Sequence, residues 1–173
     1  LVYAHEYAHG FNTGPDPLER AQAAANRAVD LAPGNALAHQ AMSTVLLLRK
    51  DVTASLHAAD RAIALNPFDA GCNANMGANI AFAGDWVRGC ALIERSMDLN
   101  PQHPVWYRGM LSYREYWSGN YRAAIDEAVR TNAPYLFWLQ IVLAAAHGQL
   151  GEQQPASAAV RAVITQIPNF SAN

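Results

Sequence analysis

One apolar stripe can be followed in full between Pro17 and Pro33. It consists of Leu18, Ala21, Ala25, Ala28 and Val29, which recur at spacings of three and four residues. This spacing predicts a helix that buries one face. The helix is expected to start at Pro17 after a capping Asp16, with Glu19 reaching back to the free N–H groups of the first turn. It is expected to end before Pro33, because proline disfavours helix in the residue before it.

The pattern repeats with a fixed period. Residues 36–69 and 70–103 align without a gap, and Pro33, Pro67 and Pro101 are each 34 residues apart. Pro134 comes one residue early, and Pro168 follows it after another 34 residues. A period of this length, with two helix-length segments in each unit, predicts a stacked array of helices.

Five units follow from this period, and each is predicted to be a helix, a tight turn and a second helix. The unit boundaries are residues 2–35, 36–69, 70–103, 105–136 and 137–170, within one domain over 1–173. The predicted helices include 1–11, 36–50, 52–65 and 86–99, and the fourth unit closes early at 131–132. Asn35, Asp51 and Asp69 are the expected N-terminal caps of three helices.

Composition narrows the functional classes. Of 173 residues, 51% are hydrophobic and 15% are charged, which is typical of a globular protein. The net charge of −2 gives no field that would attract nucleic acid or an anionic membrane, and no apolar run is long enough to span a bilayer. Two cysteines, Cys72 and Cys90, are predicted to be buried free thiols in a reducing compartment, the cytoplasm. The chain starts at Leu1 and looks like an excised piece of a longer protein.

Small residues recur at two places in the units, where paired helices would come close. The eighth position holds Ser43, Gly77 and Ser112, and the twentieth holds Ala21, Ser55, Gly89, Ala124 and Ala156. With the recurring prolines, this pattern resembles the tetratricopeptide repeat family. The resemblance implies an all-α, right-handed α-solenoid of about five helix-turn-helix repeats. It departs from the family at His39 and Asn73, where the family has an aromatic residue.

Two segments suggest a wider setting. Residues 10–39 and 97–125 are similar to repeat segments at the C-terminal end of bacterial multidomain regulators, which carry an adenylate-cyclase-type or a winged-helix DNA-binding domain ahead of the repeats. The similarity implies that this chain is the docking or regulatory part of such a signalling protein rather than its effector.

One motif indicates a different chemistry. His5, Glu6 and His9 match H-E-x-x-H, in which two histidines bind zinc and the glutamate activates a water molecule. No third histidine follows at the extended spacing, and the repeat register places an ordinary first helix there. We therefore expect no metal, no cofactor and no catalysis, with a zinc hydrolase built on His5 and His9 as the remote alternative.

The first helices of the units supply the candidate binding residues. Asn73, Asn75, Asn79, Arg108 and Arg114 could face a groove, although the lysines of a carboxylate clamp are missing. By the family's register, Trp106, Tyr113, Trp117 and Trp138 point to the concave side, where exposed aromatic rings are typical anchors. The sequence therefore predicts a non-catalytic module that binds a peptide, a partner domain or another domain of the same parent protein. The alternative is self-association into a homodimer through an uncapped C-terminal end.

Overall fold

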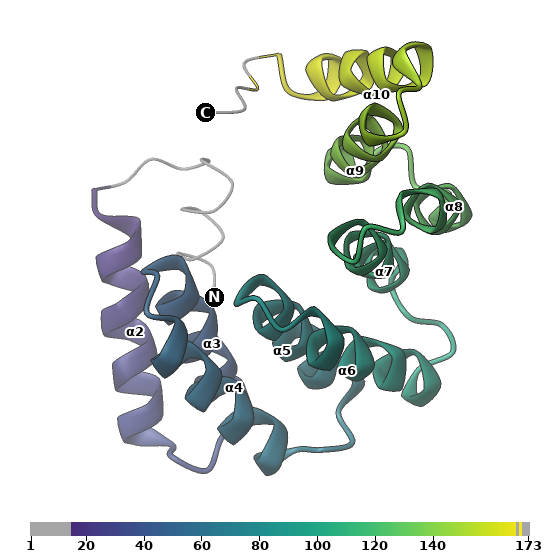
Figure 1. Cartoon of the computed structure of the whole chain (residues 1–173). Coiled ribbons are helices and arrows are strands. Elements are labelled where there is room, and N and C mark those ends of the chain that lie inside the picture. The colour runs from purple at the N-terminus through teal and green to yellow at the C-terminus, as the bar shows by residue number, and fades with distance from the viewer. Residues whose placement is uncertain (1–14, 169, 171–173) are drawn as a thin grey trace. The chain divides into compact units, whose positions relative to one another are not determined.

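The computed structural model describes residues 15–168 and 170. This part of the chain is helical and contains no strand (Figure 1). Its helices are α2 (Pro17–Leu31), α3 (Ala36–Leu48), α4 (Val52–Leu65), α5 (Ala70–Phe82), α6 (Trp86–Leu99), α7 (Val105–Trp117), α8 (Tyr121–Thr131), α9 (Phe137–Gln149) and α10 (Gln153–Gln166). The predicted all-α class is confirmed. The helix expected over residues 1–11 lies outside the described residues.

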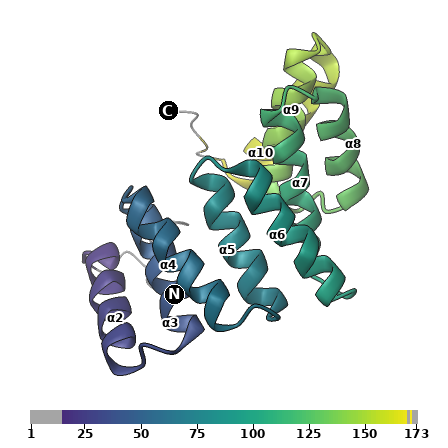
Figure 2. The same cartoon turned by 60° about the horizontal axis from the view of Figure 1, so that its bottom comes forward.

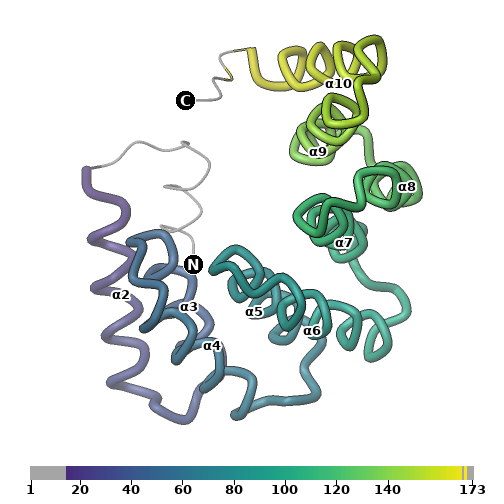
Figure 3. Tube along the Cα trace, viewed as in Figure 1, coloured from purple at the N-terminus to yellow at the C-terminus, as the bar shows by residue number. Residues whose placement is uncertain are grey.

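The helices form two compact units, residues 1–102 and 103–173. In the first unit α3 packs on α4 and α5 on α6, and Figure 2 shows the latter pair side by side. In the second unit α7 packs on α8 and α9 on α10, and the tube in Figure 3 traces the turns that join them. A single domain over 1–173 stays a prediction.

Three predicted helix caps are confirmed. The Asn35 side chain accepts hydrogen bonds from the N–H groups of Leu37 at 2.8 Å and Ala38 at 3.4 Å. Asp51 and Asp69 likewise accept from backbone N–H groups at the starts of α4 and α5. Each bond satisfies a donor that the first helical turn leaves unpaired.

The predicted cap at Asp16 is wrong. Asp16 precedes α2, but its side chain makes no capping hydrogen bond and its backbone is left-handed, with φ of 49°. A capping residue normally has extended backbone, which aims its side chain at the amides of the first turn. Glu19 does not reach back either; its carboxylate bonds Arg49, at the end of α3, at 2.6 Å.

The turns inside the helix pairs share one backbone requirement. Gly84, Gly119 and Gly151 have φ of 111°, 78° and 74°, which glycine adopts without steric cost. Lys50 holds the matching place after α3 and takes a φ of 65°. The turn geometry is therefore kept even where the sequence offers no glycine.

Paired helices touch where their side chains are smallest. Ser43 and Ser55 are buried, their hydroxyl oxygens lie 3.3 Å apart, and the Ser55 hydroxyl donates to the Ser43 carbonyl at 2.8 Å. In the next pair, a Cβ on Gly77 would lie 2.6 Å from the Gly89 carbonyl oxygen, and a Cβ on Gly89 would lie 2.5 Å from that of Gly77. Only hydrogen atoms fit between α5 and α6 at this point.

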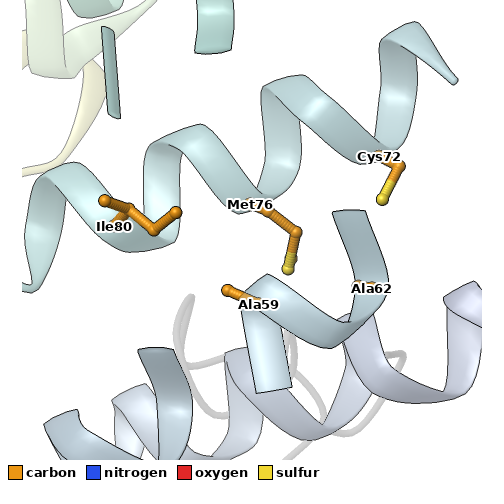
Figure 4. Packing of buried hydrophobic residues seen from close by; sticks show 5 residues of the cluster. All are labelled: Ala59, Ala62, Cys72, Met76 and Ile80. Carbon is orange, nitrogen blue, oxygen red and sulfur yellow. The ribbon is translucent and has the colours of Figure 1, made fainter. Parts of the chain in front are cut away.

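Small residues also set the spacing between pairs in the first unit. Ala59 and Ala62 of α4 pack against Cys72, Met76 and Ile80 of α5, and all five are almost fully buried (Figure 4). The alanines leave room for the longer side chains of α5. As a result α5 is the most completely buried helix of this unit, with seven buried residues against two in α2.

In the second unit, Ala124 and Ile125 of α8 pack against Val142 and Ala146 of α9. One carboxylate adds a polar tie, since Glu152 accepts hydrogen bonds from Arg122 at 2.5 Å and from His147 at 2.6 Å. These bonds, the one from Arg122 first, hold the pKa of Glu152 below its ordinary value. The tie joins the start of α8, the end of α9 and the residue before α10. None of the helices described is long and apolar enough to cross a membrane.

Adding a methyl group at the α5–α6 contact tests this packing. We expect Gly77→Ala or Gly89→Ala to lower the free energy of unfolding by about 1–3 kcal/mol, although alanine favours helix more than glycine. Gly148→Ala is the control, because a Cβ at Gly148 meets nothing within 4 Å; it should gain up to about 1 kcal/mol. Urea unfolding measures all three, and a gain in either α5–α6 variant would contradict the close contact.

Candidate functional site

Three of the four predicted aromatic anchors lie on one face of α7. Trp106, Tyr113 and Trp117 are separated by seven and four residues, so at 3.6 residues per turn they point within about 20° of a common direction. Trp106 and Tyr113 are half-buried, whereas Trp117 is 65% exposed. We call Trp106, Tyr113, Trp117 and the adjoining Trp138 the aromatic face.

Trp138, the fourth anchor, joins α9 to α7. A Cβ on Gly109 would lie 2.4 Å from Cη2 of the Trp138 indole, so the ring rests against the bare backbone of α7. The Tyr113 ring lies 5.8 Å from that of Trp138, and its hydroxyl donates to the Trp138 carbonyl at 3.2 Å. Burial raises the pKa of Tyr113 to about 12, so the hydroxyl stays protonated and keeps donating near neutral pH. Both residues thus position α9 as well as contributing ring surface.

The basic residues beside the aromatic face already have acidic partners. Arg108 lies 3.5 Å from a carboxylate oxygen of Glu127 on α8, and Glu127 also bonds Arg130 at 2.5 Å. Arg114 lies 3.1 Å from its neighbour Glu115. This surface therefore does not offer the uncompensated cations that a terminal carboxylate requires.

The asparagines of the first unit join α5 to α3. Asn79 Nδ2 donates to Ser43 Oγ at 3.0 Å and to Thr44 Oγ1 at 3.1 Å. Asn75 Nδ2 donates more weakly to Gln40, at 3.4 Å, and Asn75 is exposed. The candidate residues thus divide between two surfaces, with Asn75 and Asn79 in the first unit and the other five in the second.

The expectation that Asn73 faces the groove with Asn75 is wrong. Asn73 is fully buried, and its amide donates to the carbonyls of Pro67 and Asp69, each at 2.9 Å. Two residues apart on a helix are about 200° apart around its axis, so these two side chains cannot share a face.

The described residues give no sign of a metal centre. They contain no group of three histidine, cysteine, aspartate or glutamate side chains placed to hold an ion. Burial, with a smaller contribution from Asp69, raises the pKa of the Cys72 thiol to about 11, which makes it a poor nucleophile. His5 and His9 lie outside the described residues.

Comparison with solved structures identifies the architecture. PilW, a widely conserved type IV pilus biogenesis factor, superposes with a TM-score of 0.78 at 19% identity, over 98% of this chain and 76% of PilW. TTC0263, a thermophilic TPR protein of Thermus thermophilus, gives 0.76 at 15% identity, over 97% of this chain and 89% of its own. YrrB, a TPR protein described with an unusual peptide-binding site, gives 0.62 at 14%, over 88% of this chain and 79% of YrrB.

The chain has the tetratricopeptide-repeat fold. At these identities the likeness concerns the fold alone. No protein-family model matches the sequence, and no curated protein matches it.

Within the tetratricopeptide-repeat register, the fourth position holds polar residues that bond to their surroundings. His39 Nε2 donates to the Pro33 carbonyl at 2.9 Å, six residues back, and Asn73 bonds Pro67 in the same way one repeat later. These two side chains tie the start of each first helix to the proline connection before it. The sequence signal was the shared register of a histidine and an asparagine, each six residues after a proline.

Two tryptophans of the aromatic face should differ in their effect on stability. We expect Trp138→Ala to lower the free energy of unfolding by roughly 2–4 kcal/mol, because it empties the contact with Gly109 and Tyr113. Trp117→Ala should stay within about 0.5 kcal/mol of the unsubstituted protein, as is usual for exposed positions. Urea unfolding followed by far-UV circular dichroism compares them, and equal losses would show that the contacts of Trp138 do not hold α9.

Proposed function

We propose that this chain is a non-catalytic binding module, and that the aromatic face of the second unit takes a segment of a partner protein. The observation that carries the proposal is Trp117, a tryptophan 65% exposed at one end of a line of aromatic rings. Large exposed aromatic side chains are enriched among residues that dominate binding energy, because they offer wide contact area at small entropic cost.

The length of the face suits a short extended peptide. Trp106 and Trp117 are eleven residues apart on α7, which corresponds to about 16 Å along the helix axis. An extended chain advances about 3.3 Å per residue, so about five peptide residues would span the face.

The surrounding charges favour an apolar ligand. Because Arg108 and Arg114 already face Glu127 and Glu115, a peptide would gain little from a carboxylate and more from aliphatic or aromatic side chains. The Trp138 ring is held by Gly109 and Tyr113 before any ligand arrives. Such preorganisation lowers the entropic cost of binding.

Further considerations support a binding role. YrrB, which shares the fold, is described with a peptide-binding site. In the first unit, exposed Asn75 presents an amide that can bond a peptide backbone, whereas Asn79 is already engaged by α3. Cys72 is a buried free thiol, which supports a reducing compartment such as the cytoplasm. A place in a larger bacterial regulator stays a prediction from the sequence.

Panning the protein against a phage-displayed library of random peptides tests the proposal. We expect enriched peptides to contain two or more large apolar residues within a stretch of about five. Fluorescence anisotropy of an enriched peptide should show affinity reduced at least about tenfold in Trp117→Ala and in Trp106→Ala.

Val87→Ala is the matched control, because Val87 is 79% exposed on α6, a helix of the first unit; this variant should bind normally. If no peptide is enriched, or if enriched peptides bind the Trp117 and Trp106 variants as well as the control, the aromatic face is not the binding site.

A further inference from the structure

A second apolar surface lies in the last helix pair, apart from the aromatic face. It is a groove of about 370 Å³ between α9 and α10, lined by Ala144 and Ala145 from α9, by Val160 and Ile164 from α10, and by Phe170. Val160 is 46% exposed, Ile164 49% and Phe170 39%. Nothing in the proposed peptide-binding function uses this groove.

The groove combines projecting and recessed apolar groups. Val160 and Ile164 stand one turn apart on α10, and the two alanines of α9 are short side chains beside them. A surface with both kinds of group can fit a copy of itself, because the branched side chains of each copy meet the alanines of the other. Such an isologous contact places the same residues on both sides of a two-fold axis.

The charges around the groove select this occupant over a charged partner. Between residues 137 and 166 only Glu152 and Arg161 are charged, apart from His147. Glu152 is already bonded by Arg122 and His147. In contrast, α2 and α6 each carry four charged residues. Two copies that meet through a nearly neutral face avoid the like-charge repulsion that usually opposes self-association.

We propose that two copies of this chain associate through the α9–α10 groove. A helix of 14 residues is about 21 Å long, and two adjacent helices present a face roughly 20 Å wide. The contact therefore falls below the roughly 1,200 Å² of buried surface that marks stable interfaces. The dimer is accordingly weak, with a dissociation constant in the micromolar range or above.

Sedimentation velocity of the 173-residue chain, from roughly 1 µM to roughly 500 µM, measures this association directly. The weight-average mass should rise with concentration toward that of a dimer. Ile164→Glu should raise the dissociation constant at least about tenfold, because it places a carboxylate of each copy in an apolar contact.

Val129→Glu is the matched control, since Val129 is 63% exposed on α8 of the same unit; its dissociation constant should be unchanged. Circular dichroism checks the folding of each variant, and Val160→Glu, one turn away, replaces Ile164→Glu if that variant unfolds. A chain that stays monomeric throughout overturns the proposal and leaves the groove to another partner. A dimer that both groove variants leave intact, or that Val129→Glu disrupts, also overturns it.

Discussion

The structure depends on how closely two helix backbones approach within a pair. At Gly77 and Gly89 a single Cβ would collide with the facing carbonyl oxygen, and at Ser43 and Ser55 two hydroxyl groups fill the same place and bond. Packing at this distance brings many backbone and side-chain atoms into van der Waals contact, which is individually weak and collectively large. It also fixes the direction of each first helix, and therefore the direction of its outward side chains.

The same principle shapes the candidate binding surface. Gly109 lets the Trp138 indole rest directly on α7, and the Tyr113 hydroxyl then bonds the Trp138 carbonyl. Those contacts align α9 with α7 and leave Trp117 exposed beside a rigid wall of rings. A missing side chain in one helix thus determines what the neighbouring helix can present to a partner.

The period and the turn residues were sufficient to predict the helix pairs, and α4 and α6 begin and end where the sequence placed them. The conformation of Asp16 could not be predicted, because any residue before Pro17 looks like a cap until its backbone angles are known. For the site, helical spacing placed Trp106, Tyr113 and Trp117 together. Which ring stays exposed could not be read from spacing, because it depends on the seat that Gly109 provides for Trp138 across two helices.

Hydrogen exchange of the backbone amides in the native protein tests the central claim most directly, since it ranks the helices by the free energy needed to open them. If the close contact at Gly77 and Gly89 supports the first unit, the amides of α5 and α6 should exchange slowest in that unit and at similar rates. The amides of α2, which has only two buried residues, should exchange faster. Slower exchange in α2 than in α5 and α6 would contradict this account.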